Sequence, residues 1–155
     1  QMVKLEGGAV ITDTVKQLTA RGIPVCGHLG LLPQSVHRLG GYIVQGRETQ
    51  AAEELIADAI SLQEAGADML VLECVPATLG AVVSKQLDIP VIGIGAGSDC
   101  DGQVLVVYDM LGLTPGRRPR FSHDFLADTG SIQAALTNYV QSVKSGAFPN
   151  AEQQF

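Results

Sequence analysis

The sequence predicts an α/β protein built on a parallel β-sheet, and three observations lead to this fold class. Segments with a strand pattern alternate with segments of helical periodicity, as in successive βαβ units. Residues 69–72 and 90–94 are apolar at every position or nearly so, as strands buried on both faces of a parallel sheet are. No low-complexity linker interrupts the pattern, so we expect a single domain over residues 1–155, with either an open doubly wound sheet or part of a closed barrel.

Composition excludes several classes of protein. The 155 residues are 46% hydrophobic and 17% charged, which is too apolar for a disordered polyelectrolyte and sufficient for one sizeable core. No apolar run approaches the roughly 18 residues of a membrane span, and a net charge of -6 argues against a broad face for nucleic acid or anionic membrane. Cys26, Cys74 and Cys100 form an odd set without metal-ligand spacing, which indicates reduced thiols in a cytoplasmic protein.

The first half of the chain is predicted to hold two strands and a helix. Residues 2–5 form a short strand that ends at Gly7. The spacing of Ile11, Val15 and Leu18 predicts a helix that ends at Gly22. A strand over residues 23–26 follows and leads into a tip at residues 27–30, after which residues 31–47 form a loop longer than most βα connections. Such loops are often lids or contact surfaces.

The second half continues the alternation of helix and strand. An apolar stripe predicts a helix from Ala51 to about Gly66. Apolar runs predict strands at residues 69–72 and 90–94, and a helix is expected between them at residues 76–86. Residues 104–111 are expected to be helical or a short apolar insert. A last amphipathic helix carries the stripe from Ile132 to Val143, and the tail after Gly146 is expected to be a surface extension.

Polar side chains follow the strands at their carboxyl ends. Side chains alternate along a strand, so Lys4 and Glu6 share one face, and Glu73 and His28 lie on the equivalent faces of their strands. We expect the helices to cover one face, formed by Val3, Leu5, Leu70, Leu72, Ile92 and Ile94. The other face then gathers a lysine, two carboxylates, an imidazole and a wall without side chains at Gly93 and Gly95, in line with Val91. Active sites of α/β barrels and open α/β sheets both lie at this end.

Each of these residues has a structural alternative. Glu6 and Glu73 could be strand-end glutamates that turn to water, and Glu6 could accept the amide hydrogens of Gly7 and Gly8. Together with Lys4 on the same face, the two carboxylates favour a functional site, because a carboxylate at the rim of an apolar core is costly unless it is paired or bound to a metal. Lys4 suits a substrate carboxylate or keto oxygen, which is compatible with an ion pair to Glu6. His28 could contact a substrate oxygen or be a satisfied strand-end histidine.

Other motifs carry weaker signals. Residues 93–97 suggest a dinucleotide loop, but Ser98 stands where the third glycine belongs. One loop carries a basic group that is either a solvated turn or a site for an anionic cofactor tail: Arg117, Arg118 and Arg120. Two further histidines, His37 and His123, are expected on the surface.

The strand ends and the loops that follow them, taken in chain order, resemble those of the ketopantoate hydroxymethyltransferase (3-methyl-2-oxobutanoate hydroxymethyltransferase) family. The resemblance runs from Val3 to the tail and rests on these segments: residues 3–8, 24–30, 33–36, 40–42, 44–47, 72–76, 92–97, 101–106 and 148–155. It implies the C-terminal portion of a TIM (β/α)8 barrel. It also implies transfer of a hydroxymethyl group from 5,10-methylenetetrahydrofolate to 3-methyl-2-oxobutanoate, giving ketopantoate for pantothenate biosynthesis.

The resemblance also assigns roles. Glu73 matches the proton acceptor, Lys4 a residue that binds the keto acid and Glu6 a carboxylate at a Mg2+ site, and His28 is a further substrate-binding candidate. Mg2+ is a hard cation suited to carboxylate and keto oxygens, and it would acidify the neighbouring C–H. The family forms large homo-oligomers, usually decamers.

Two departures accompany the resemblance. Leu32 stands where the family usually has threonine. A barrel has typically about 250 residues, so this chain is expected to be an incomplete barrel from about the fourth strand onward, without the two aspartates that complete the Mg2+ site. Its N-terminal half would be a partner, supplied by a separate chain or by the rest of a longer protein. Two other functions stay open: a related Mg2+-dependent 2-oxo acid carbon–carbon lyase, and a non-catalytic α/β ligand-binding module.

Overall fold

The computed structural model describes residues 1–37 and 40–155 and contains a parallel five-stranded sheet. The strands are β1 (Val3–Glu6), β2 (Val25–Gly30), β3 (Met69–Glu73), β4 (Val91–Ile94) and β5 (Gly102–Gln103). Their order across the sheet is their order along the chain, and every neighbouring pair is parallel. A doubly wound sheet reverses its strand order at a switch point, and no such reversal occurs within the described residues.

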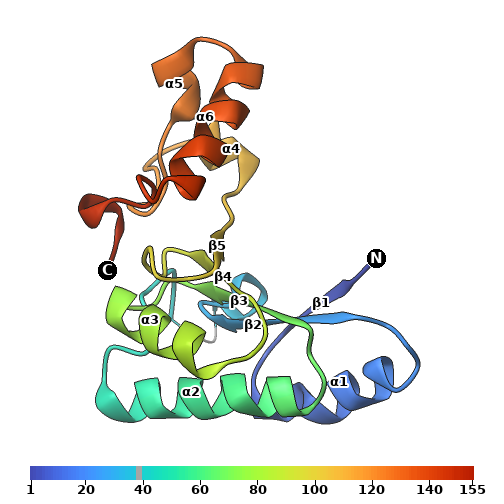
Figure 1. Cartoon of the computed structure of the whole chain (residues 1–155). Helices are drawn as coiled ribbons and strands as arrows, with labels where there is room; N and C mark the ends of the chain where they lie inside the picture. The colour runs from blue at the N-terminus through green and yellow to red at the C-terminus, as the bar shows by residue number, and fades with distance from the viewer. Residues whose placement is uncertain (38–39) are drawn as a thin grey trace.

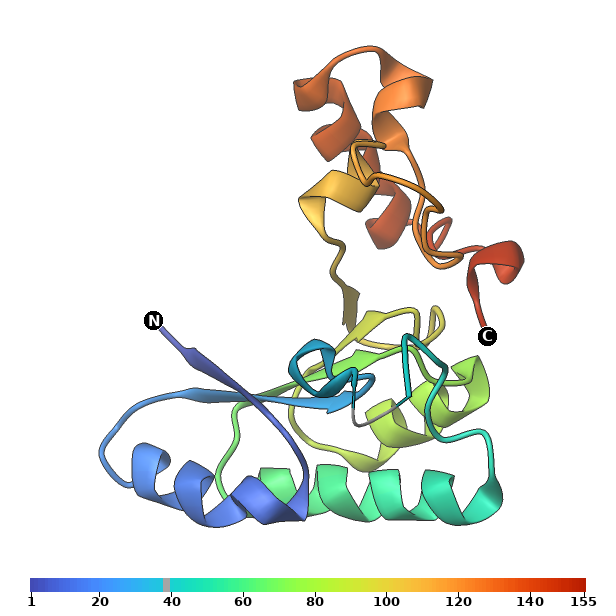
Figure 2. The same ribbon diagram turned by 180° about the vertical axis from the view of Figure 1, so that it is seen from behind.

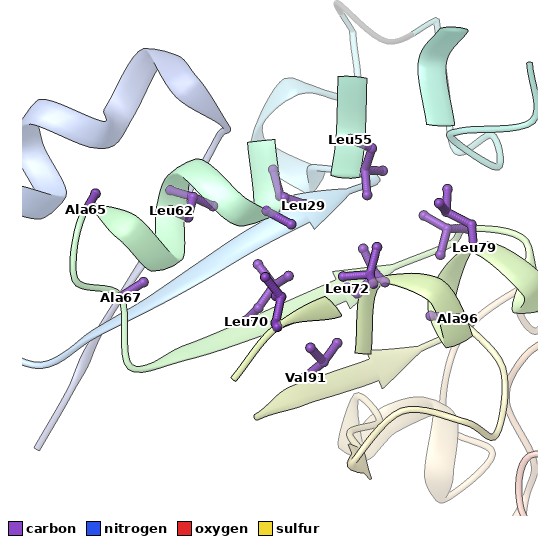
Figure 3. Packing of buried hydrophobic residues seen from close by; sticks show 14 of the residues in the cluster. Leu29, Leu55, Leu62, Ala65, Ala67, Leu70, Leu72, Leu79, Val91 and Ala96 are labelled. Atoms are coloured by element: carbon purple, nitrogen blue, oxygen red, sulfur yellow. The ribbon is translucent and has the colours of Figure 1, made fainter. Parts of the chain in front are cut away.

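Three helices cover one face of the sheet. They are α1 (Thr12–Thr19), α2 (Thr49–Glu64) and α3 (Ala77–Gln86), and all three lie on the same side in Figures 1 and 2. Leu62 of α2 packs with Leu70 and Leu72 of β3 in the main core, and all three are at most 1% exposed (Figure 3). Burying a leucine stabilises a fold by about 1.5–3 kcal/mol, so this layer is the principal source of stability.

The C-terminal helices stand on the other side of the sheet, beside β4 and β5 (Figure 1). They are α4 (Val107–Met110), α5 (Phe125–Thr129) and α6 (Ile132–Lys144), and short 3₁₀ helices lie at Ala9–Ile11, Pro33–Ser35 and Ala151–Gln153. A second core joins these helices to the strand tips, since Phe125 and Phe148 cluster with Leu31, Cys74 and Ile94.

Most predicted elements are confirmed, with differences near the C-terminus. Only residues 107–110 of the predicted segment 104–111 are helical. The prediction that the tail after Gly146 is a surface extension is wrong: Phe148 is buried in the second core, and the backbone oxygen of Phe155 accepts the Ala77 amide at 2.9 Å. The tail packs against the molecule because its aromatic side chains, Phe148 and Phe155, contact the second core. Residues 38 and 39 of the predicted lid segment 31–47 lie outside the described residues.

None of the helices in the described ranges combines the length and apolar character that crossing a bilayer requires.

Candidate active site

Four predicted side chains meet at the carboxyl ends of three adjacent strands. Lys4 and Glu6 lie on β1, His28 on β2 and Glu73 on β3. Glu6 is in register with His28, and His28 with Val71, two residues before Glu73. Because side chains in register share a face of a parallel sheet, all four project from the face opposite to helices α1–α3. The predicted convergence is confirmed for these strands.

His28 occupies the centre of the group. Its side chain is buried, with the residue only 3% exposed. Its Nδ1 atom lies 3.0 Å from Nζ of Lys4, and its Nε2 atom lies 3.1 Å from Oε2 of Glu73. The second approach is short, but its angles fall outside those of a hydrogen bond, so Nε2 is a buried atom without a hydrogen-bond partner among the described residues. One imidazole therefore bridges a lysine and a carboxylate from the two flanking strands.

Glu6 is held from two sides. Its Oε1 atom lies 3.5 Å from Nζ of Lys4 and 3.8 Å from Nδ1 of His28. Its Oε2 atom accepts the backbone amide of Gln34 at 3.2 Å, from the 3₁₀ turn Pro33–Ser35. The predicted ion pair with Lys4 is therefore present. The alternative acceptance from Gly7 is not, because the Gly7 amide donates to the backbone oxygen of His28.

The backbone around Glu73 is fixed by the neighbouring strand ends. The Leu31 amide donates to the Glu73 backbone oxygen at 2.8 Å, and the Cys74 amide donates to Ile94 at 2.9 Å. Cys74 has a φ of 50°, the one positive φ among the described non-glycine residues. This left-handed residue turns the chain sharply after Glu73. The Glu73 side chain, 13% exposed, thus stands at the end of a rigid strand.

The thiols close to this site are protonated rather than nucleophilic. Burial raises the pKa of Cys74 to about 12, and the neighbouring Glu73 charge adds to the effect. Burial also raises the pKa of Cys26, although a backbone hydrogen bond and the Lys4 charge oppose it. Nucleophilic catalysis by cysteine needs the thiolate, so acid–base chemistry by the carboxylates and His28 is the chemistry this group of residues supports.

Comparison with known proteins identifies the family of this chain. The sequence profile of the ketopantoate hydroxymethyltransferase family matches residues 1–151. The chain belongs to this family. It is 62% identical over 155 residues to the 3-methyl-2-oxobutanoate hydroxymethyltransferase of Alkalilimnicola ehrlichii and 63% identical over 154 residues to that of Thiobacillus denitrificans. It is also 62% identical over 152 residues to the protein of that name from Nitrosococcus oceani.

The matched regions cover this chain almost fully but not the relatives. They include 100%, 99% and 98% of this chain, respectively, and 56%, 58% and 58% of the three relatives. The chain therefore spans a little over half the length of the ketopantoate hydroxymethyltransferases that it matches.

The Mg2+ site implied by the family is not formed by this chain alone. Within residues 1–37 and 40–155, no group of three histidine, cysteine, aspartate or glutamate side chains is arranged to hold a metal ion. Glu6 offers carboxylate oxygens of the kind that Mg2+ prefers, but one of them already accepts the Gln34 amide. The residues present therefore do not fit a complete site.

The predicted glycine wall is wrong. Val91 and Gly93 are in register with Leu70 and Leu72, so they face helices α1–α3, while Ile92 and Ile94 take the opposite face. A Cβ on Gly93 would lie 3.0 Å from Sγ of Cys100, and one on Gly95 would lie 2.8 Å from the ring of Phe121. The chain's own side chains fill the space beside both glycines, so these glycines permit close packing rather than ligand binding.

The remaining candidates lie elsewhere. Arg117 and Arg118 are exposed. Arg120 stacks over the Phe155 ring, 5.6 Å from its centroid, and donates to the Glu152 backbone oxygen. These contacts support a surface turn. His37 is exposed, and Nε2 of His123 lies 2.6 Å from Oδ2 of Asp128.

Two groups that hold the site residues in place were not predicted from the sequence. The Gln34 amide holds Glu6, and Gly30 leaves room for the Glu73 backbone. Gly30 offered a signal, because a glycine that ends a strand often marks the close approach of another backbone. The Gln34 amide offered none, since a backbone donor has no signature in the side-chain pattern.

Proposed function

We propose that this chain forms the C-terminal portion of a TIM (β/α)8 barrel that acts as a 3-methyl-2-oxobutanoate hydroxymethyltransferase. The enzyme would transfer a hydroxymethyl group from 5,10-methylenetetrahydrofolate to 3-methyl-2-oxobutanoate and release ketopantoate. The observation that carries the proposal is the clustering of Lys4, Glu6, His28 and Glu73 at the carboxyl ends of three adjacent parallel strands. Active sites of such barrels lie at this end.

Each role follows from the position of the side chain. Lys4 is 48% exposed, so its ammonium group is accessible to the carboxylate or keto oxygen of the substrate. Glu73 stands at the rim of the core, partly exposed, as a general base must be to reach the C–H next to the ketone. Removal of that proton gives an enolate. Water would cleave the two C–N bonds of the one-carbon unit, so that tetrahydrofolate leaves, and the enolate carbon would bond to the resulting formaldehyde carbon to give the hydroxymethyl group.

The N-terminal half of the barrel is proposed as the partner of this chain. The strands follow one another across the sheet in chain order, and helices α1, α2 and α3 lie on one face, as in consecutive units of a barrel. Glu6 is proposed as a single ligand of Mg2+, with the remaining ligands supplied from outside residues 1–155.

We also propose a cytoplasmic homo-oligomer, a decamer by family resemblance. Exposed apolar side chains on α4 and α6 support an interface between copies; they are Val107, Tyr108, Ile132, Leu136 and Val140. The three cysteines are free, as in a reducing compartment.

The test is folate-dependent formation of ketopantoate by this chain assembled with its proposed N-terminal half. We expect ketopantoate only when 3-methyl-2-oxobutanoate, 5,10-methylenetetrahydrofolate and Mg2+ are all present. Cleavage of a larger 2-oxo acid without folate would identify a carbon–carbon lyase instead. Failure of the assembly to bind any 2-oxo acid would indicate a non-catalytic module.

A further inference from the structure

We propose that His28 is a positioning residue for Glu73 rather than a ligand of the substrate. Lys4 fixes the tautomer of the imidazole, and the imidazole in turn presents an N–H to one oxygen of Glu73. This inference rests on the proposed function only in taking Glu73 as the proton acceptor. The tautomer itself is a property of the structure, whatever reaction the site performs.

The contact with Lys4 decides which ring nitrogen carries the proton. A lysine ammonium group is a donor only, so a nitrogen at hydrogen-bond distance from it must accept. Nδ1 of His28 lies 3.0 Å from Nζ of Lys4. The Nδ1 lone pair is therefore engaged, and the ring proton is on Nε2.

The Nε2 atom lies beside Glu73. Nε2 lies 3.1 Å from Oε2 of Glu73, and it makes no hydrogen bond to any other described residue. The distance is that of a hydrogen bond, whereas the angle is not. Catalytic hydrogen bonds are often poorly aligned without substrate and tighten in the complex, so a small rotation of the carboxylate completes this one.

Burial separates the role of His28 from that of a substrate ligand. Lys4 and Glu73 flank its two nitrogens at 3.0 and 3.1 Å, and the residue is 3% exposed, which leaves little room for a substrate atom beside the ring. Within the described ranges Oε1 of Glu73 makes no hydrogen bond, so holding Oε2 would leave Oε1 available to the substrate proton. Rotation of an unheld carboxylate would misplace the base, and a misplacement of about 1 Å costs about 100-fold in rate.

Two substitutions of His28 distinguish positioning of Glu73 from binding of substrate, because the side-chain amides of glutamine and asparagine replace different atoms of the imidazole ring. His28→Gln places an amide N–H at the position of Nε2, whereas His28→Asn reaches only the position of Nδ1. In the assembled enzyme we expect His28→Asn to lower kcat about 100-fold with KM for the keto acid changed less than about threefold. We expect His28→Gln to restore most of kcat. His123→Gln, at a histidine of the C-terminal region, is the matched control, and unfolding temperatures verify that each variant is folded.

The tautomer is measured independently by 15N solid-state NMR of histidine-labelled protein, with the His28 signals assigned by their absence in His28→Gln. A protonated Nε2 and an unprotonated Nδ1 are expected, and a proton on Nδ1 would overturn the proposal. It is also overturned if both variants raise KM and leave kcat unchanged, since His28 would then bind substrate. If the unsubstituted assembly forms no ketopantoate, the proposed function fails, while the NMR measurement still decides whether His28 donates to Glu73.

Discussion

Gly30 and the backbone oxygen of Glu73 lie so close together that a methyl group on Gly30 would force them apart. A Cβ on Gly30 would lie 2.0 Å from the backbone oxygen of Glu73, and Gly30 has a φ of +87°. This contact lies beside the hydrogen bond from the Leu31 amide to the same oxygen. The proposed base is therefore held through its own backbone, independently of the proposed contact between its side chain and His28.

Gly30→Ala should displace the end of β3 and with it Glu73. Strain in the left-handed region and the steric clash act together, so we expect the unfolding temperature to fall by at least about 6 °C and kcat to drop by about 100-fold. Gly22→Ala is the control, because Gly22 has a φ of +73° and no atom within 4 Å of its Cβ position. Strain alone should lower its unfolding temperature by about 2–4 °C. Equal effects from the two substitutions would show that the contact with Glu73 does not matter.

Glu73→Gln should abolish proton abstraction while leaving the keto acid bound. The amide is almost the same size as the carboxylate but cannot accept the proton. Exchange of the C3 hydrogen of 3-methyl-2-oxobutanoate with deuterated solvent, followed by NMR, should fall by at least about 100-fold. Calorimetry should show little change in keto-acid affinity, and the exposed Glu53→Gln serves as control. Exchange at the unsubstituted rate would assign the base elsewhere.

Mg2+ should bind to the assembly but not to residues 1–155 alone. Glu6 is proposed to contribute one carboxylate, and no group of three suitable side chains lies within residues 1–37 and 40–155. In the assembly, Glu6→Gln should weaken Mg2+ binding by about 10–100-fold in a calorimetric titration. Removal of Mg2+ with a chelator should stop turnover, and adding it back should restore it. Tight binding of Mg2+ by this chain alone would contradict the assignment.

Tyr139 should make stability fall at high pH. Burial raises its pKa from 10.0 to about 12, and its hydroxyl donates to the Gln103 backbone oxygen at 2.8 Å. Below pH 10 the phenol is protonated in both states. Between pH 10 and about 12 the unfolded chain ionises first, so the contribution of this group to the free energy of unfolding is progressively lost.

Tyr139→Phe should therefore lower the free energy of unfolding by about 1 kcal/mol at pH 8 and reduce the further loss between pH 9 and pH 11. Urea unfolding at these pH values measures both effects. Tyr108→Phe is the control, because Tyr108 is 61% exposed. An unchanged alkaline loss in Tyr139→Phe would place its origin in another group.

The main layer and most of the site were predictable because their patterns are periodic. Repeated apolar spacing located α1, α2 and α6, and alternation along β1, β2 and β3 placed Lys4, His28 and Glu73 on one face. The face of β4 was not predictable, because a strand that is apolar on both sides gives no alternation to read. Its register, with Val91 beside Leu70, reversed the expected orientation.

The C-terminal region depended on contacts that have no period. Phe148 and Phe155 are isolated aromatic residues in a polar tail. Their packing depends on the second core, which the sequence pattern does not reveal. The five-residue helix α5 is too short to show periodicity. Its ends were nevertheless marked: Asp124 accepts the Ala127 amide at the N-terminus, and Gly130 has a φ of 73° at the C-terminus.

The order of the strands also bears on how the protein acquires its structure. Every strand pairs with the one that precedes it in sequence, so closing each pair requires only the intervening loop and helix rather than a distant segment. The entropy lost in closing a loop grows with its length, and folds with contacts of short sequence separation assemble faster. Within the described residues, the sheet can therefore form one unit at a time between β1 and β5. Lys4, Glu6 and His28 belong to the first pair of strands, and Glu73 joins them when β3 pairs with β2.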